Sequence, residues 1–357
     1  MTNIDRPREK MAEEGVEALL LSEITNVGWA TGFKGSSGWA IVLKEGGRFI
    51  TDSRYTIAAQ EEVKDLPSFT FASPTTGAQF LKRQFDELGI KAIGFESAFV
   101  TYATFEEWSK AFAPIELKPV KDLVGPIRMV KMPDEIAAIK RACKLTDACF
   151  DHVRRMIQPG VSEFDIALEI EFYFRRNGAE LAFAPAVVSG ERSARPHGKP
   201  SERKLQRGDF VTLDFGAKVD GYCADMTRTM VVEEATDRHR EIYNQVLEAQ
   251  LASIEAMKPG VAAKDVDGLA RQVLGKKDLA QYFGHGLGHG LGRVVHDGGR
   301  MAVTSTDTLA PGQVWTVEPG VYIEGFGGVR IEDDVVVTES GVEVLTHSPK
   351  ELLVLPG

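Results

Sequence analysis

Two aspartates, Asp214 and Asp225, flank an Asp220-Gly221 pair in an otherwise apolar part of the chain. An Asp-Gly pair between two strand-like segments is a strong signal for a two-residue hairpin turn. Such a turn places Asp225 opposite Gly216 and makes Asp214 its diagonal neighbour on the same face. Two solvated aspartates would be an ordinary interpretation of this pair alone, but the apolar neighbours of Asp214 favour a buried position. Buried carboxylates this close repel each other unless cations lie between them.

A second pair of carboxylates, Glu318 and Glu332, is centred on Gly325 within a glycine-rich segment. A hairpin that turns there brings the two glutamates opposite each other. Glu332 belongs to a Glu-Asp-Asp run, which by itself would indicate a charged strand end. Glu318 lies in an otherwise apolar strand and is followed by Pro-Gly, so a solvated position explains it poorly.

Three of the seven histidines, His285, His289 and His296, fall within the loop GHGLGHGLGRVVHD. Its glycines let the backbone approach a site closely. Core packing is a poor explanation of so many histidines in so short a segment, so we predict a functional role. His197, in the segment SARPHG, follows another turn-rich loop and is a weaker candidate, because a surface histidine would look the same.

Together, one histidine and four carboxylates form a hard, oxygen-rich set of ligands. Such a set suits a pair of ions such as Mn, Co, Fe or Zn better than a thiolate site or a single structural zinc. Two such ions can share a bridging hydroxide and polarise a carbonyl at neutral pH. The sequence has no H-E-x-x-H, G-x-S-x-G or P-loop motif, so zincins, serine hydrolases and P-loop enzymes have no support. The residues therefore predict hydrolysis at a dinuclear metal centre.

The composition is that of an ordinary soluble globular protein, with 43% hydrophobic and 26% charged residues among 357. The net charge is −10 and Lys and Arg form no run, which argues against nucleic acid as a partner. Cys143, Cys149 and Cys223 form no C-x-x-C pair, which favours a reducing compartment. We find no secretory signal and no stretch of about 20 apolar residues. These features predict a cytoplasmic protein with no membrane partner.

The elements that must position these residues fall into two parts. In the first 125 residues short apolar strands alternate with helices, which indicates a small α/β domain. The Gly125-Pro126 pair then breaks the pattern before a helix that begins near Pro133. We therefore predict two domains, 1–127 and 128–357. The elements expected in the first are strands at 18–21, 39–43 and 92–95 and a helix at 76–88 that ends at Gly89.

The second part pairs helices with glycine-rich, strand-like segments, which indicates an α+β class. Two helices precede the first hairpin and two more precede the strands that carry Glu318 and Glu332, so the order hints at an internal duplication. The expected helices cover 134–156, 163–177, 238–257 and 263–274, and the expected strands cover 210–219, 222–232 and 314–344.

These motifs closely resemble the metal-dependent aminopeptidase P/prolidase family. The likeness covers most of the chain and includes IRMVKMPDEIAAIKRAC, SGERSARPHG, both hairpins, the histidine loop and HSPKELLVL. It implies a small N-terminal creatinase/prolidase-like α/β domain followed by a pita-bread catalytic domain. It also implies a dinuclear peptidase that hydrolyses the Xaa-Pro bond at the N-terminus of dipeptides or short peptides. Mn is the expected metal, with Co, Zn or Fe as alternatives, and a homodimer is the expected assembly.

Carried over residue by residue, the resemblance gives each ligand a role. Asp214 would bind one metal, and Asp225 would be a bridging ligand. His289 and Glu318 would bind the other metal. Glu332 would bridge both. Glu318 would also handle the proton of the attacking water as general acid/base.

The same resemblance assigns His197, His285 and His296 to catalysis. They would hold the scissile carbonyl, stabilise the oxyanion and help the departing amine gain a proton. His197 and His296 would thereby contact the substrate. An Xaa-Pro bond has a tertiary amide nitrogen that must be protonated as it leaves, so the site needs proton donors as well as metals.

Three further residues match supporting positions in the family. Tyr322 would line the substrate pocket. Arg330 and Thr316 would orient Glu332 and Glu318 from behind the ligands.

Two arginines near the histidine loop bear on specificity. Arg293 stands where the family often has an apolar residue, and it either binds a substrate carboxylate or is a solvated loop residue. Arg300 is the only arginine between the last histidine of the loop and Glu318, where longer prolidases have an arginine-rich loop. Two alternatives to a peptidase remain: a small-molecule amidinohydrolase or lyase of the same fold, and a binding protein without activity. The complete ligand set favours the peptidase.

Overall fold

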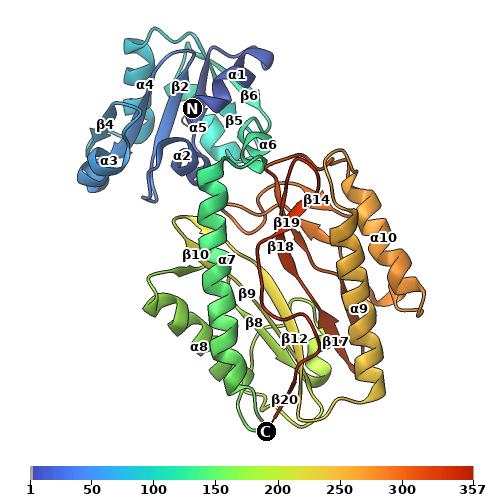
Figure 1. Cartoon of the computed structure of the whole chain (residues 1–357). Coiled ribbons are helices and arrows are strands. Elements are labelled where there is room, and N and C mark those ends of the chain that lie inside the picture. Colours follow the sequence, from blue (N-terminus) through green and yellow to red (C-terminus); the bar gives the residue numbers. More distant parts are fainter. Residues whose placement is uncertain (1–2, 357) are drawn as a thin grey trace. The chain divides into compact units, whose positions relative to one another are not determined.

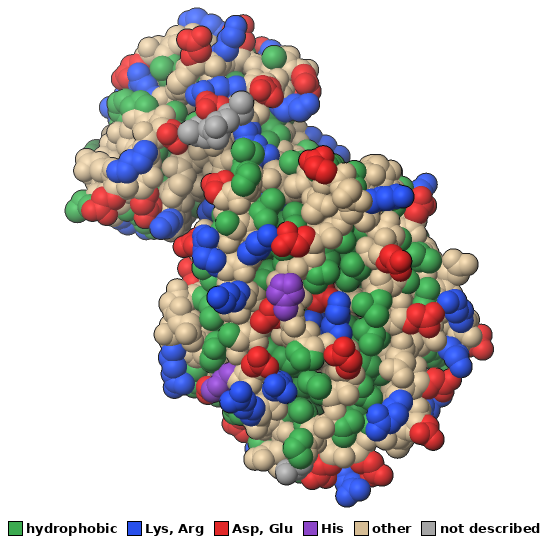
Figure 2. Space-filling view, in the orientation of Figure 1, with side chains coloured by type: hydrophobic (Ala, Val, Ile, Leu, Met, Phe, Trp, Pro, Cys, Tyr) green, Lys and Arg blue, Asp and Glu red, His purple; other side chains and the backbone are tan. Residues whose placement is uncertain are grey.

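A computed structural model describes residues 3–356 and divides the chain into two compact units, residues 1–127 and 128–357 (Figure 1). Within the described residues no helix combines the length and apolar character that crossing a membrane requires. Acidic and basic side chains are interspersed on the face that Figure 2 shows.

The first unit is built on a six-stranded sheet in the order β4-β3-β2-β1-β5-β6. Its central strand β1 is a fully buried apolar run, and alternate side chains feed two apolar clusters, one on each face of the sheet. The strands are β1 (Ala18–Leu21), β2 (Trp39–Leu43), β3 (Gly47–Asp52), β4 (Ser68–Phe71), β5 (Ala92–Glu96) and β6 (Glu116–Val120), and the α-helices are α1 (Arg6–Glu13), α2 (Ile24–Thr31), α3 (Thr56–Glu62), α4 (Gly77–Glu87) and α5 (Tyr102–Ala111). Helix α6 (Val124–Met129) contains the boundary between the two units.

Helix α4 shows how local chemistry sets the element boundaries in this unit. Thr76 Oγ1 accepts a hydrogen bond from the Gln79 N–H, and the Gln79 side chain accepts one from the Thr76 N–H. This capping box starts the helix. Gly89, with φ of 67°, lies just beyond its end, as predicted. The three predicted strands are also present, and β5 continues one residue further than expected, to Glu96.

The second unit packs long helices against several small sheets, whose strand pairs are antiparallel except for the parallel pair of β12 and β20 (Figure 1). Helix α7 lies on β10 and β11, and α9 lies on α10 and on β15, β16 and β17. Two helices precede each group of strands, as predicted. The helices are α7 (Pro133–Val153), α8 (Glu163–Arg176), α9 (Asp237–Ala256) and α10 (Ala263–Gly275). The strands are β7 (Glu180–Leu181), β8 (Ala186–Ser189), β9 (Phe210–Phe215), β10 (Ala217–Val219), β11 (Tyr222–Cys223), β12 (Met226–Val232), β13 (Gly288–His289), β14 (Arg300–Met301), β15 (Val314–Val317), β16 (Gly320–Ile323), β17 (Gly327–Arg330), β18 (Asp333–Val337), β19 (Val342–Val344) and β20 (Val354–Leu355).

The first hairpin has the predicted turn and register. Asp220 and Gly221 have φ of 52° and 82°, the left-handed values that a tight hairpin turn of this kind requires. β10 pairs with β11 and β9 with β12 in one continuous register, in which Thr227 faces Asp214. Asp225 lies in the break between β11 and β12.

The second hairpin also follows its prediction. β16 with β17 and β15 with β18 share one register centred on Gly325. Glu318 lies between β15 and β16, and Glu332 lies between β17 and β18. The two glutamates therefore stand across from each other where the regular pairing is interrupted.

Candidate metal centre

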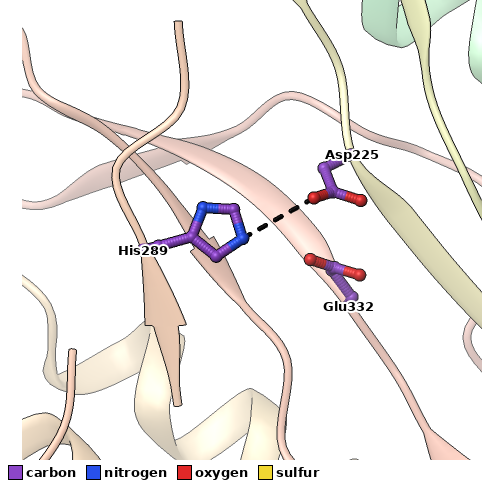
Figure 3. Close-up of side chains that lie close together, drawn as sticks. All are labelled: Asp225, His289 and Glu332. Atoms are coloured by element: carbon purple, nitrogen blue, oxygen red, sulfur yellow. Dashed lines mark ion pairs between the residues drawn. The ribbon is translucent and has the colours of Figure 1, made fainter. Parts of the chain in front are cut away.

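Three side chains of ligand type meet at one point in the second unit. Asp225, His289 and Glu332 each place one ligand atom within 4.8 Å of the other two. Figure 3 shows them directed toward one another from three separate segments of the chain. His289 Nε2 lies 3.7 Å from Asp225 Oδ2 and 3.5 Å from Glu318 Oε1. These separations are too long for good hydrogen bonds and leave room for a cation.

A cavity of about 760 Å³ brings the whole predicted ligand set together. Asp214 and Glu318 line it with the three residues above, and so do the three predicted catalytic histidines, His197, His285 and His296. The wall is completed by side chains that include Phe183, Pro196, Arg300, Ala302 and Arg330.

The four carboxylates of this cavity repel one another. Burial, reinforced by Glu332 and Asp214, raises the pKa of Asp225 well above its ordinary value. Burial also raises the pKa of Glu332, and it raises that of Glu318 to about 8. One oxygen each of Asp214, Asp225 and Glu332 is buried without a hydrogen-bond partner among the described residues. Buried acceptors are normally satisfied, so this donor set fits divalent cations.

His289 presents Nε2 to the carboxylates. Its Nδ1–H donates to the Gly290 carbonyl at 3.1 Å, which leaves Nε2 as an acceptor. Burial lowers the pKa of His289 to about 4, so the ring is neutral at pH 7, as a metal ligand must be. Thr316 Oγ1 accepts from the His289 N–H and donates to Glu318 Oε1 at 3.3 Å. Thr316 therefore links the histidine to the glutamate that we expected it to orient.

Arg330 holds Asp214 directly, whereas we expected it to orient Glu332. Its Nη2 donates to Asp214 Oδ2 at 2.6 Å. Its Nε donates to Thr227 Oγ1, which in turn donates to Glu332 Oε2 at 2.6 Å. Thr227, on the neighbouring strand, stands between the arginine and the glutamate and takes over the expected role. Thr227 was not among the predicted site residues, although the predicted register places it opposite Asp214.

We expected Tyr322 to line the cavity, but it lies behind the cavity wall. Its hydroxyl makes two hydrogen bonds to residues of the wall. The hydroxyl accepts a hydrogen bond from Arg330 Nη1 at 2.7 Å and donates to His285 Nε2 at 2.8 Å. His285 Nδ1–H donates to the Gly286 carbonyl at 2.8 Å, and burial lowers the pKa of His285 to about 4. Both ring nitrogens of this neutral histidine are occupied, so His285 is poorly placed to donate a proton.

His197 and His296 differ from His285 in this respect. Both line the cavity, and neither ring nitrogen makes a hydrogen bond to any residue that the structure describes. His296 packs edge-on against His289, with 4.2 Å between ring centroids, and burial lowers its pKa. These two rings are the histidines that a ligand in the cavity can reach.

Arg293 and Arg300 differ in their position relative to the cavity. Arg293 packs its guanidinium over the ring of Tyr222, 5.3 Å from the ring centroid, and does not line the cavity. Its backbone N–H donates to Asp297 at 2.8 Å, and Asp297 also forms a buried ion pair with Arg128. This arrangement fixes the loop with the Arg293 side chain outside the cavity, so the expected contact with a substrate carboxylate has no support. Arg300 lines the cavity instead.

Two glycines allow the ligand-bearing segments to approach closely. A Cβ atom at Gly216 would lie 1.7 Å from the Ala224 carbonyl oxygen, beside Asp225. A Cβ at Gly288 would lie 2.0 Å from the Thr316 carbonyl oxygen, beside His289. Any side chain at either position would push apart the backbone segments that carry the ligands.

Comparison with known proteins agrees with this site. Residues 137–339 match metallopeptidase family M24, and residues 3–130 match the creatinase/prolidase N-terminal domain. The chain therefore belongs to metallopeptidase family M24. The predicted family, the pita-bread fold and the assignment as a metallopeptidase are confirmed.

Individual relatives are similar over nearly their whole length. The solved Xaa-Pro dipeptidase from Bacillus anthracis is 41% identical with a TM-score of 0.94, over 99% of both chains. The X-Pro aminopeptidase from Thermotoga maritima is 37% identical with a TM-score of 0.91, over 98% of this chain and 100% of the other. The Xaa-Pro dipeptidase of Pyrococcus horikoshii is 35% identical over 97% of each chain. Because dipeptidase and aminopeptidase are both this similar, the fold alone does not separate the two activities.

Proposed function

We propose that this protein is a dinuclear metallopeptidase that hydrolyses Xaa-Pro dipeptides. The observation that carries the proposal is the convergence of five ligands on one cavity: Asp214, Asp225, His289, Glu318 and Glu332. Two divalent ions held there would supply an activated water and a polarised carbonyl. Mn is the ion that we propose, because four carboxylates with a single imidazole favour a hard cation.

The remaining chemistry belongs to side chains of the cavity. Glu318 takes the proton of the attacking water on its carboxylate. His197 and His296, whose ring nitrogens are free toward the cavity, stabilise the developing oxyanion and pass a proton to the prolyl nitrogen. For His285 we propose a supporting role in place of proton donation, because its Nε2 accepts a hydrogen bond from the Tyr322 hydroxyl, which itself accepts one from Arg330.

Arg300 supports a preference for dipeptides over longer peptides. It lines the cavity, its guanidinium forms no ion pair within the described residues, and strand pairing places it opposite His289. A guanidinium recognises a carboxylate well. In an Xaa-Pro dipeptide the free carboxylate belongs to the proline itself, next to the bond that is cut.

The experiment that tests the proposal compares Ala-Pro with Ala-Pro-Ala on metal-stripped protein to which Mn, Co or Zn is returned. We expect metal-dependent cleavage of Ala-Pro, fastest with Mn, and slower cleavage of the tripeptide. Preference for the tripeptide would make the protein an aminopeptidase P. Turnover without metal, or no turnover of either peptide, would contradict the peptidase assignment and direct attention to small-molecule substrates.

A matched pair of variants tests the role of Arg300. Arg300→Gln should raise KM for Ala-Pro by roughly 10- to 100-fold, the loss of one charged hydrogen-bonded contact. The KM for Ala-Pro-Ala should change less. Arg293→Gln, in the arginine that lies outside the cavity, should leave both constants near the wild-type values. Equal effects of the two variants would remove Arg300 from substrate binding.

We also propose a homodimer that works in the cytoplasm. The match of residues 3–130 to the creatinase/prolidase N-terminal domain supports the dimer by resemblance, and the odd number of cysteines supports a reducing compartment. Light scattering behind size exclusion should give twice the chain mass of 39.1 kDa. A mass of one chain would contradict the dimer.

A further inference from the structure

The segment 190–201, here called the His197 loop, joins β8 to the stretch before β9 and carries Pro196 and His197 on the cavity wall. Glu163, the first residue of α8, lies outside this wall and is fully buried. We propose that Glu163 is a positioning residue for His197. The inference rests on the proposed peptidase function, in which His197 contacts the substrate.

The two oxygens of Glu163 hold the two ends of the His197 loop. Oε1 accepts hydrogen bonds from the N–H and the hydroxyl of Ser189, at 2.7 and 2.8 Å. Oε2 accepts hydrogen bonds from the N–H and the hydroxyl of Ser201, at 3.1 and 2.7 Å. One carboxylate therefore closes the loop at its base. Hydrogen bonds to a carboxylate are about twice as strong as neutral ones, so the closure is firm.

Arg192 extends this closure toward the histidine. Its Nε lies 3.3 and 3.2 Å from the two oxygens of Glu163 and balances the buried charge. Its Nη2 donates to the Lys199 carbonyl at 2.8 Å. The arginine thus spans the loop from its base to a point two residues beyond His197.

The opposite side of the loop is held by β17. The Gly328 N–H donates to Ser193 Oγ at 2.8 Å, and Arg330 Nη1 donates to the Pro196 carbonyl at 3.3 Å. The residue before His197 is therefore tied to the arginine that also holds Asp214. With Glu163 at one side and β17 at the other, the loop holds His197 in a fixed place relative to the ligands, and catalytic groups need such fixed placement.

Glu163→Gln tests the proposal with almost no change of volume. The amide places N–H donors where Ser189 or Ser201 needs an acceptor, so one end of the loop is released. We expect kcat for Ala-Pro to fall by roughly 10- to 100-fold, the effect of misplacing a catalytic group by about 1 Å. Mn affinity should change by less than about twofold. Glu171→Gln, a control on the same helix whose carboxylate has no partner among the described residues, should keep wild-type kcat.

A double variant separates positioning from general destabilisation. If Glu163 acts through His197, adding Glu163→Gln to His197→Ala should lower kcat no further. A full multiplicative loss in the double variant would overturn the proposal, and so would wild-type kcat in Glu163→Gln alone. If Glu163→Gln does not fold, Arg192→Met, at the partly exposed end of the same network, takes its place with the same expected loss.

Hydrogen exchange supplies a readout that does not depend on activity. Amides of residues 190–201 should exchange faster in Glu163→Gln, while those of β9, β12, β15 and β18 keep wild-type rates. Faster exchange throughout the second unit would indicate a structural role only and would overturn the proposal. Failure of the wild type to cleave any Xaa-Pro peptide would instead remove the proposed function, and the exchange pattern would still show whether Glu163 holds the loop.

Discussion

At the scale of single residues, two of the predicted metal ligands, Asp214 and Glu332, share one pattern of hydrogen bonding. In each carboxylate one oxygen accepts a hydrogen bond from a neighbouring side chain and the other oxygen has no partner among the described residues. Arg330 binds Asp214 Oδ2, and Asp214 Oδ1 is left without a partner. Thr227 binds Glu332 Oε2, and Glu332 Oε1 is left without a partner. The two donors therefore orient the carboxylates but leave one oxygen of each without a hydrogen bond. This division suits side chains that must hold a cation with the second oxygen.

The mutual repulsion of these carboxylates gives a prediction in which stability and metal binding move in opposite directions. Asp225→Asn removes a buried acid from the cluster, so the metal-stripped variant should melt roughly 2–4 °C above metal-stripped wild type, the shift expected for about 1 kcal/mol. The same variant should lose the stabilisation that Mn gives to the wild type and most of its activity. Differential scanning calorimetry with and without Mn measures the first two effects, and hydrolysis of Ala-Pro measures the third.

Asp220→Asn is the matched control for that variant. Asp220 lies on the same hairpin, is exposed and has φ of 52°, which asparagine tolerates. Its ion pair with Arg141 lies at the surface and contributes little. The control should respond to Mn as the wild type does. A metal-stripped Asp225→Asn protein that melts below wild type would contradict the repulsion argument.

At the scale of elements, the hairpins place ligands because their strands can approach without side chains between them. Gly216→Ala puts a methyl group 1.7 Å from the Ala224 carbonyl oxygen, so the hairpin must open beside Asp225. We expect Mn affinity to fall at least about tenfold, as for other changes that displace metal ligands. We also expect a loss of stability of about 2 kcal/mol or more. Titration calorimetry and urea unfolding measure the two effects.

Gly268→Ala is the same substitution in an open environment. Gly268 lies in α10, and a Cβ there meets no atom within 4 Å. Alanine should stabilise the helix by roughly 0.5–1 kcal/mol and leave Mn affinity unchanged. If Gly216→Ala were equally harmless, the close approach at the hairpin would not be what positions Asp225.

The start of α9 should make stability depend on pH. Thr236 caps this helix, and His239 Nδ1 accepts a hydrogen bond from the Thr236 N–H at 3.0 Å. Burial lowers the pKa of His239 from 6.5, so the folded state prefers the neutral ring. The stabilisation is therefore complete above pH 6.5 and is lost as the pH falls toward the lower folded-state pKa, because protonation breaks the cap. The loss should be about 1 kcal/mol, the usual value of a helix cap.

Urea unfolding at pH 7.5 and 5.5 measures this loss against two variants. His239→Gln keeps an acceptor at the capping position and should lose less stability between the two pH values than the wild type. His347→Gln, in an exposed histidine, should keep the wild-type dependence. Identical pH dependence in all three proteins would show that the cap does not titrate.

At the scale of the whole molecule, each unit has its own apolar core, and every predicted metal ligand lies in residues 128–357. Mn should therefore stabilise only the second unit. At about 100 times the dissociation constant, binding adds about 2.7 kcal/mol. That gain should raise the melting temperature by roughly 5–10 °C in calorimetry of the full chain. Residues 1–127 expressed alone should unfold cooperatively with no response to Mn, and a response there would contradict the assignment.

The sequence by itself determined the features that depend on neighbouring residues. Asp220-Gly221 strongly favours a tight turn, and that turn set the register that places Thr227 opposite Asp214. The capping chemistry of Thr76 and Gly89 set the ends of α4 in the same way. The resemblance to a known family then gave the ligands their expected roles. These features were predictable because steric limits and hydrogen bonds within a few residues decide them.

Only the tertiary structure decided where the long side chains point. Arg330 binds Asp214, 116 positions away in the chain, and it reaches Glu332 only through Thr227. The same packing turns Tyr322 behind the cavity wall and places Arg293 outside it. A long side chain has many rotamers of similar energy, and the choice among them depends on partners that the fold brings together from distant parts of the chain.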